Sequence, residues 1–140
     1  MKVPGQILVV DDDEEDHEIL RAACDILGTC NALQFFYNGH DLLDYLKTTK
    51  VQPFIILCDI NMPHINGLDL REIIWKDENL RNISIPFIFF STAANSAQVK
   101  QAYQLTVQGF FLKGNSMKET VRKLRLILEY WAESKHPNSY

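Results

Sequence analysis

The stretch CDINMPHING, residues 58–67, decides how the rest of the chain is interpreted. It continues an apolar run, residues 54–58, that is typical of a buried strand, and its first charged residue is Asp59. A loop punctuated by Pro63 comes next, and a helical pattern begins at about Gly67. In open α/β sheets, ligands bind just outside the carboxyl ends of the strands, which is where Asp59 would lie. Taken alone, the same aspartate is equally typical of a residue that turns the chain or caps a helix.

Four further apolar runs have the length and composition of strands. Residues 7–10, ILVV, are continuously apolar, as expected of a strand buried on both faces. Six consecutive acids, residues 11–16, follow this run directly. The other runs are residues 33–37, 87–90 and 109–112. With the run before Asp59, the sequence predicts five strands.

Helical periodicity appears between and after these strands. The apolar residues expected to face the core are Ile19, Leu20, Ala23, Ile26, Leu27, Leu42, Leu43, Leu46, Leu68, Ile73, Ile74, Ala97, Tyr103, Leu105, Met117, Val121, Leu124, Ile127, Leu128 and Trp131. In the third helix we expect Arg71, Glu72 and Lys76 to face water. The stripe of the fourth helix, residues 97–105, is thin.

Five strands alternating with five helices predict an α/β fold. We expect a doubly wound, five-stranded parallel sheet of (βα)5 order, with flavodoxin-like topology and helices on both faces. The whole chain, residues 1–140, is predicted to form a single domain with a core of about residues 5–133. Residues 134–140 are expected to form a frayed tail.

The composition excludes several classes of function. With 140 residues, 46% of them apolar and 23% charged, the chain resembles one soluble globular domain. A formal net charge of −4 argues against binding nucleic acid through a broad basic surface. No apolar run approaches the roughly 18 residues of a membrane span, and the first residues break too soon for a signal peptide. We therefore expect a cytoplasmic protein without nucleic acid or membrane partners.

Three cysteines, Cys24, Cys30 and Cys58, are too few and too irregularly spaced for a disulfide framework or a zinc site. Cys24 and Cys58 lie in apolar patterns and are expected to be small buried hydrophobic residues. This number and spacing of cysteines indicates a protein of a reducing compartment.

Charged or reactive side chains stand at the ends of four predicted strands: Asp11 with Asp12, Asp59, Ser91 with Thr92, and Lys113. In a parallel sheet these ends share one edge, so the side chains should converge. Three neighbouring carboxylates raise one another's pKa, and a divalent cation relieves that conflict. With oxygen ligands and no His or Cys expected nearby, Mg²⁺ is favoured, with Mn²⁺ as the alternative.

The chemistry that this set suggests is phosphoryl transfer to a carboxylate. Asp59 would attack in line, Lys113 would neutralise charge on the transferred group, and the Ser91 hydroxyl would donate a hydrogen bond to it. Each element also has a plain structural interpretation: Asp11 and Asp12 as helix-cap acids, Ser91 as a turn residue, and Lys113 as a surface lysine. Their joint placement at successive strand ends favours the functional interpretation.

With these residues in place, the chain resembles the receiver domain of two-component response regulators over roughly residues 5–133. The matching residues are Ile7-Leu8-Val9-Val10-Asp11-Asp12, Asp59-x-Asn61-Met62-Pro63, Gly67, Ser91 and Lys113. The resemblance implies that Asp59 is the phospho-acceptor and that Asp11 and Asp12 hold Mg²⁺ directly or through water. It implies that Asn61 lends its backbone carbonyl to the metal, and that Ser91 and Phe110 are the two switch residues.

The resemblance also implies a signalling role. A sensor histidine kinase or a histidine phosphotransfer protein would donate the phosphoryl group. The face formed by residues 97–105, 109–112 and 117–131 would then switch the binding of an output partner. We expect a stand-alone receiver that performs no catalysis beyond gaining and losing its own phosphoryl group; homodimer formation is left open. The segment 77–86 resembles single-domain receivers paired with phytochrome-like or hybrid kinases.

The chain departs from the family pattern at four positions. Gly114 replaces the usual proline after the lysine, which predicts a freer loop around Lys113. Ser91 replaces the commoner threonine, and Thr92 replaces the usual alanine. Ala93 offers no side-chain polar group to guide water, so we expect an aspartyl-phosphate that loses its phosphoryl group slowly.

Three other functions fit these residues less well. A Mg²⁺-dependent phosphatase with an aspartyl nucleophile would place a second Asp two residues later, where this chain has Asn61. A flavin-binding electron carrier would need a phosphate-cradling loop after the first strand, where the chain has six acids. A degenerate receiver acting as a constitutive scaffold is disfavoured by the intact acids and by Lys113.

Overall fold

A computed structural model describes residues 1–29 and 32–139 of the chain. Cys30, one of the three cysteines considered above, and Tyr140 of the expected tail lie outside the described residues.

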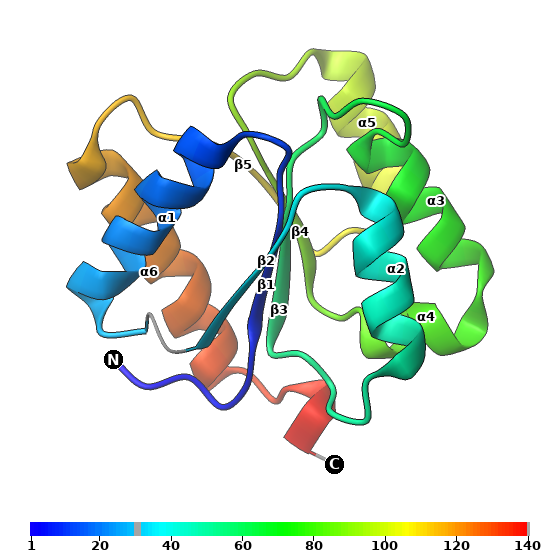
Figure 1. The fold of residues 1–140 in the computed structure, drawn as a ribbon, viewed down its shortest axis with the longest axis horizontal. Helices are drawn as coiled ribbons and strands as arrows, with labels where there is room; N and C mark the ends of the chain where they lie inside the picture. The colour runs from blue at the N-terminus through cyan, green and yellow to red at the C-terminus, as the bar shows by residue number, and fades with distance from the viewer. Residues whose placement is uncertain (30–31, 140) are drawn as a thin grey trace.

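The five predicted strands form one parallel sheet. They are β1 (Ile7–Val10), β2 (Leu33–Phe36), β3 (Ile55–Cys58), β4 (Phe87–Ser91) and β5 (Gly109–Leu112), and their order in the sheet is β2-β1-β3-β4-β5 (Figure 1). This is the flavodoxin-like order. The predicted fold class is confirmed.

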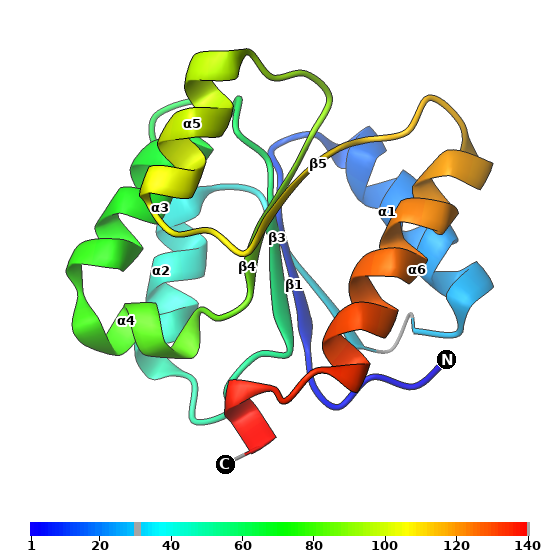
Figure 2. The same ribbon diagram turned by 180° about the vertical axis from the view of Figure 1, so that it is seen from behind.

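Helices cover both faces of the sheet. Those of the described residues are α1 (Glu14–Leu27), α2 (Gly39–Thr48), α3 (Gly67–Lys76), α4 (Glu78–Ile83), α5 (Ser96–Gln104) and α6 (Met117–Glu133), followed by a 3₁₀ turn at Pro137–Ser139. Helices α1 and α6 lie on one face, and α2 to α5 lie on the other (Figures 1 and 2). Within the described part of the chain, no helix combines the length and apolarity needed to cross a bilayer.

Helix α4 is an addition to the five helices that periodicity predicts. It begins where the side chain of Asp77 accepts a hydrogen bond from the Leu80 amide at 3.1 Å, which caps the helix. Leu80 is the only buried residue among the six residues of α4. The helix therefore has no repeated spacing of apolar residues by which it could be predicted from the sequence.

The alternation of side chains along β1 divides the core between the two faces. Leu8 and Val10 belong to the cluster beneath α2 and α3, whereas Ile7 and Val9 pack with residues of α1 and α6. All four are buried. A continuously apolar strand is therefore required, as expected for a parallel sheet covered on both sides.

Several residues expected to face the core lie at the surface instead. They are Ile19, Ile26, Ile73, Ala97, Tyr103 and Met117. In α1 the buried positions are His17, Leu20, Ala23, Cys24 and Leu27, which follow the spacing of one helix face. Ile26, 61% exposed, falls outside that face. The burial of Cys24 and Cys58 confirms the expectation for those residues.

Arg71 of α3 was expected to face water but is almost completely buried, with 1% of its surface exposed. Its Nε donates to the Leu105 carbonyl at 2.9 Å, and an Nη donates to the carbonyl and hydroxyl of Thr106, both at 3.3 Å. Burial lowers the pKa of Arg71 to about 10, so the guanidinium stays charged at neutral pH.

These contacts explain how α5 is held despite its thin apolar stripe. Its last turn contains no basic residue, and Ala102 is its only buried residue. Arg71 supplies the missing positive charge at the C-terminal end of α5, where helix carbonyls favour a cation. A capping box between Asn95 and Gln98 fixes the other end.

The segment after α6 packs against the domain rather than fraying. His136 is 2% exposed, and its Nδ1 accepts from the Asn138 amide at 3.0 Å. The other ring nitrogen therefore carries the proton and donates to the Phe54 carbonyl. The ring also stacks on Phe54, with centroids 5.2 Å apart. The expectation of a frayed tail was wrong for this segment.

We predict that Arg71→Ala lowers the free energy of unfolding by about 3 kcal/mol, because it opens a cavity and leaves the carbonyls of Leu105 and Thr106 without a donor. Urea denaturation followed by circular dichroism measures this. Arg125→Ala, at an exposed position of α6, is the control and should change stability by less than about 0.5 kcal/mol. Equal effects of the two substitutions would contradict the role given to Arg71.

Candidate functional site

The register of β1 and β3 brings the first two predicted acids together. Val10 is paired with Cys58, so Asp11 and Asp59 follow at adjacent positions, and the Asp59 amide donates to the Val10 carbonyl at 2.9 Å. The strand order reverses between these two strands, which is the place where open α/β sheets bind ligands. Both side chains are sheltered, with Asp11 2% and Asp59 8% exposed.

Asp12 completes a group of three carboxylates. Oxygen atoms of Asp11, Asp12 and Asp59 all lie within 4.8 Å of one another. The Asp13 amide donates to Oδ1 of Asp11 at 3.0 Å, and the Ile60 amide donates to Oδ1 of Asp59 at 2.9 Å. A backbone amide therefore orients one oxygen of each of these two carboxylates. An all-oxygen donor set of this size fits Mg²⁺ or Mn²⁺.

The environment of these acids disfavours their charged forms. Burial raises the pKa of Asp59, and the nearby charge of Asp12 raises it further, although Lys113 and the Ile60 amide act in the opposite direction. Burial also raises the pKa of Asp11, with a smaller contribution from Asp59. Ionisation of either group therefore carries a free-energy cost, which a bound cation would offset.

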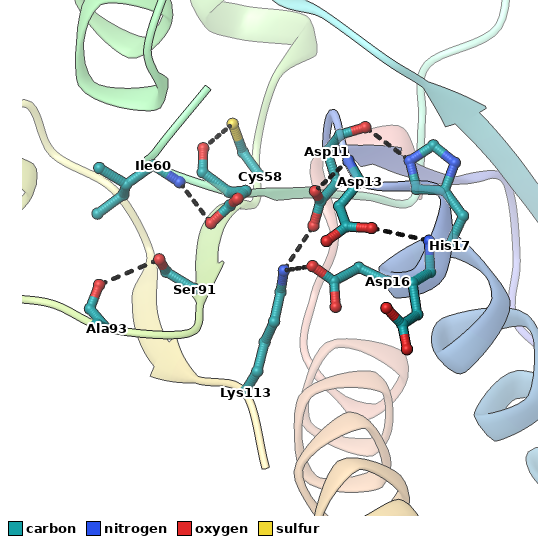
Figure 3. Close-up of polar contacts among 11 residues, drawn as sticks. Asp11, Asp13, Asp16, His17, Cys58, Ile60, Ser91, Ala93 and Lys113 are labelled. Carbon is teal, nitrogen blue, oxygen red and sulfur yellow. Dashed lines mark hydrogen bonds and ion pairs between the residues drawn. The ribbon is translucent and has the colours of Figure 1, made fainter. Parts of the chain in front are cut away.

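Lys113 reaches this group from the end of β5. Its amide donates to the Ser91 carbonyl at 2.7 Å, which aligns the ends of β4 and β5. Its ammonium lies 2.5 Å from Oδ2 of Asp11 and 3.0 Å from Oδ2 of Asp16 (Figure 3). Although burial lowers the pKa of Lys113, Asp11, Asp59 and Asp16 together raise it above the ordinary value. The lysine is a fixed cation beside the acids.

The remaining predicted residues surround this centre. Ser91 is fully buried, and its hydroxyl donates to the Ala93 carbonyl at 3.2 Å (Figure 3). Phe110 is partly buried, with its ring centroid 5.6 Å from that of Phe89. Asn61 is exposed in the loop after Ile60.

Two glycines allow the close approach of helices to this edge of the sheet. A Cβ on Gly67 would lie 2.2 Å from the Asp59 carbonyl oxygen. A Cβ on Gly114 would lie 2.4 Å from the Cβ of Glu119 and 2.8 Å from the Thr120 amide nitrogen. Gly114 was expected to loosen the loop around Lys113; instead it lets the loop pack against the first turn of α6.

Two residues near the site were missed by the sequence interpretation. His17 is buried, its Nε2 lies 2.7 Å from the Asp11 carbonyl oxygen, and its ring stacks on Phe35. Its Nε2 is engaged with the Asp11 backbone, and His17 does not belong to the group of residues that could hold a metal ion. Asp16 was assigned only to the first turn of a helix, but it pairs with Lys113. No local pattern in the acidic run distinguishes Asp16, because its partner Lys113 lies 97 residues further along the chain.

Taken together, the β2-β1-β3-β4-β5 sheet, the acids at the ends of β1 and β3 and the lysine at the end of β5 define a receiver domain. Residues 7–125 match the response regulator receiver domain family. The chain belongs to this family, which confirms the resemblance found in the sequence.

Known relatives include proteins of similar length. The probable methanogenesis regulatory protein FilR2 of Methanothrix harundinacea is 26% identical over 91% of this chain and 84% of its own length. Response regulator Rcp1 of Synechocystis sp. is 23% identical over 94% of this chain and 91% of its own length.

Solved structures share the fold. The phosphorylated cyanobacterial phytochrome response regulator RcpA gives a TM-score of 0.84, with 22% identity over 95% of this chain and 98% of that chain. The Mn²⁺-bound form of Rcp1 gives a TM-score of 0.78, with 24% identity over 94% of this chain and 97% of that chain.

We predict that Gly114→Ala lowers the free energy of unfolding by about 1–3 kcal/mol, since the new methyl group would collide with the start of α6. Gly109→Ala is the matched control: its Cβ would lie 3.4 Å from the Phe111 ring, an ordinary contact. The control should change stability by less than about 1 kcal/mol. Urea denaturation of both variants makes the comparison, and an unaffected Gly114→Ala protein would show that the loop adjusts freely.

A second prediction concerns the raised pKa of Asp59. Because its folded pKa lies above the ordinary value of 3.8, the folded state binds the proton more tightly than the unfolded state. This stabilising contribution is present below pH 3.8 and is lost as the pH rises through the folded pKa. At neutral pH in EDTA, Asp59→Asn should therefore raise the Tm by a few degrees.

Thermal denaturation with EDTA and with excess MgCl₂ checks this. Mg²⁺ should reduce the difference in Tm between the wild type and Asp59→Asn, because it stabilises the ionised wild-type site. Asp44→Asn, at an exposed position of α2, should leave the Tm unchanged. A lower Tm for Asp59→Asn in EDTA would show that the carboxylate stabilises the fold.

Proposed function

We propose that the chain is a phospho-accepting receiver that takes a phosphoryl group from a phosphohistidine onto Asp59. The donor would be a sensor histidine kinase or a histidine phosphotransfer protein. The observation that carries the proposal is the convergence of Asp11, Asp12 and Asp59, with oxygens within 4.8 Å of one another, beside the ammonium of Lys113.

In this reaction a carboxylate oxygen of Asp59 attacks phosphorus in line, and the phosphorus–nitrogen bond of the donor breaks. The electron pair of that bond stays on the imidazole nitrogen. The Ile60 amide, which donates to Oδ1 of Asp59, helps to orient the carboxylate for the attack, and the Lys113 ammonium neutralises charge on the transferred group. Hydrolysis of the acyl phosphate later returns the carboxylate.

Asp11, Asp12, Asp59 and the backbone carbonyl of Asn61 are the proposed ligands of Mg²⁺, with Mn²⁺ as an alternative. When bound, the metal would neutralise charge on the carboxylates and on the phosphoryl oxygens. The RcpA structure is that of a phosphorylated response regulator and the Rcp1 structure that of a Mn²⁺-bound one, and both fit this assignment.

The proposed output is a change at the face formed by α5, β5 and α6. A phosphoryl group adds nearly two negative charges and three acceptor oxygens. The Ser91 hydroxyl, which donates to the Ala93 carbonyl, would gain a stronger acceptor on Asp59, and Phe110 would follow it inward. The population would shift toward conformations that make these contacts.

This face has features of a protein-binding surface. It contains a hollow of about 430 Å³ lined in part by Phe110 and Trp131. Tyr103, Leu126 and Tyr130 are 51%, 52% and 65% exposed on the same elements. An output protein or a second copy of the chain would bind here, in the cytoplasm, in response to phosphorylation.

The other candidate functions have less support. Asn61 stands where an aspartyl phosphatase would need a second acid, and the geometry of the acids and Lys113 argues against a degenerate scaffold. We therefore propose no chemistry beyond the gain and loss of the chain's own phosphoryl group.

Acetyl phosphate with Mg²⁺, followed by intact-protein mass spectrometry, tests the proposal. We expect one added phosphoryl group on the wild type, and none on Asp59→Asn or in the presence of EDTA. Asp44→Asn, which alters a distant surface acid, should be modified as fast as the wild type. Unchanged labelling of the Asp59→Asn protein would place the phospho-acceptor elsewhere.

A further inference from the structure

Lys113 has two carboxylate partners, and only one of them belongs to the proposed metal site. Its ammonium contacts Oδ2 of Asp11 at 2.5 Å and Oδ2 of Asp16 at 3.0 Å (Figure 3). Asp11 is part of the group of three carboxylates, whereas Asp16 is not. Two cations, the ammonium and a divalent metal, would therefore compete for Asp11.

Both oxygens of Asp11 are already engaged. Oδ1 accepts from the Asp13 amide, and Oδ2 contacts Lys113. Asp13 is also the N-cap of α1, where its side chain accepts from the Glu15 amide. The Asp13 amide is fixed by the start of the helix. The partner of Asp11 that can move away is therefore the long side chain of Lys113.

An ammonium released from Asp11 needs another anion nearby. The side chain of Lys113 is 10% exposed, and its surroundings include the apolar side chains of Leu20 and Phe90. An unpaired charge in such a place is strongly destabilising. Asp16, in the first turn of α1 and 20% exposed, already lies within reach.

We propose that Asp16 is a positioning residue that retains the Lys113 ammonium when a divalent cation occupies Asp11. It lowers the cost of metal binding, because Lys113 can leave Asp11 without losing its last anionic partner. It also keeps the ammonium close to Asp59, where the phosphoryl group arrives. The inference rests on the proposed function, since it requires the metal site.

Mg²⁺ affinity in a double-mutant cycle tests this. Asp16→Asn should raise the Kd for Mg²⁺ about three- to tenfold, because Lys113 is then held by Asp11 alone. In a Lys113→Gln background the same substitution should change the Kd by less than about twofold. Isothermal titration calorimetry at fixed ionic strength measures all four proteins, and circular dichroism verifies that each is folded.

Asp13→Asn is the matched control. It removes one negative charge from the same acidic stretch but keeps the amide that binds Asp11, and asparagine caps a helix as well as aspartate does. The Kd should change by no more than about twofold, which separates the role of Asp16 from a general loss of charge.

A spectroscopic readout follows the ammonium directly. With lysine side chains labelled with ¹⁵N, the ammonium signal of Lys113 should persist after Mg²⁺ is added to the wild type, because Asp16 still holds it. In Asp16→Asn the signal should broaden on Mg²⁺ addition through faster exchange with water. A merely structural role for Asp16 would not produce this dependence on the metal.

The outcomes are distinguishable. Normal Mg²⁺ binding with no effect of Asp16→Asn would overturn this inference alone. An equal effect of Asp16→Asn with and without Lys113 would overturn it too, because Asp16 would then act as a simple charge or as a ligand. Failure of the wild type to bind Mg²⁺ would overturn the metal site and this inference with it.

Discussion

The structure depends on the parallel register of β1 and β3, which places two buried carboxylates side by side. Asp11 and Asp59 follow the paired residues Val10 and Cys58, and the backbone bond from Asp59 to Val10 holds them there. Like charges in a sheltered place repel, and burial raises the pKa of both. The fold tolerates this arrangement because β1 and β3 are apolar strands, buried on both faces, that hold the backbone in place.

The rest of the site balances that charge without removing it. The amides of Asp13 and Ile60 each donate to one oxygen of a carboxylate, and Lys113 supplies one positive charge among several acids. Gly67 allows α3 to begin almost in contact with the Asp59 carbonyl. The negative charge is only partly neutralised, since the single ammonium of Lys113 faces the carboxylates of Asp11, Asp16 and Asp59 together. A divalent cation is the chemical complement of what remains.

The strands and their charged ends could be predicted from the sequence because both signals are local. An apolar run that ends in Asp59 or Lys113 needs no knowledge of its neighbours. Arg71, His136 and α4 could not be predicted in the same way. Arg71 is buried because carbonyls of Leu105 and Thr106, far along the chain, accept its donors. Nothing in the pattern of α3 distinguishes such an arginine from a solvated one, and the burial of His136 likewise depends on Phe54.

The same contacts indicate how a local change of charge could reach the surface. The backbones of Ser91 and Lys113 are joined by a hydrogen bond at the ends of β4 and β5. Phe110 lies in β5, the edge strand that ends just before Lys113. Helix α5 begins four residues beyond Thr92, and Ala102 is its only buried residue. A capping box holds its first turn, and the hydrogen bond from Arg71 to the Leu105 carbonyl holds its last. An element secured at its ends and poorly packed along its length can be displaced with little loss of apolar contact. The proposed switch thus uses a helix that contributes only one buried residue to the core.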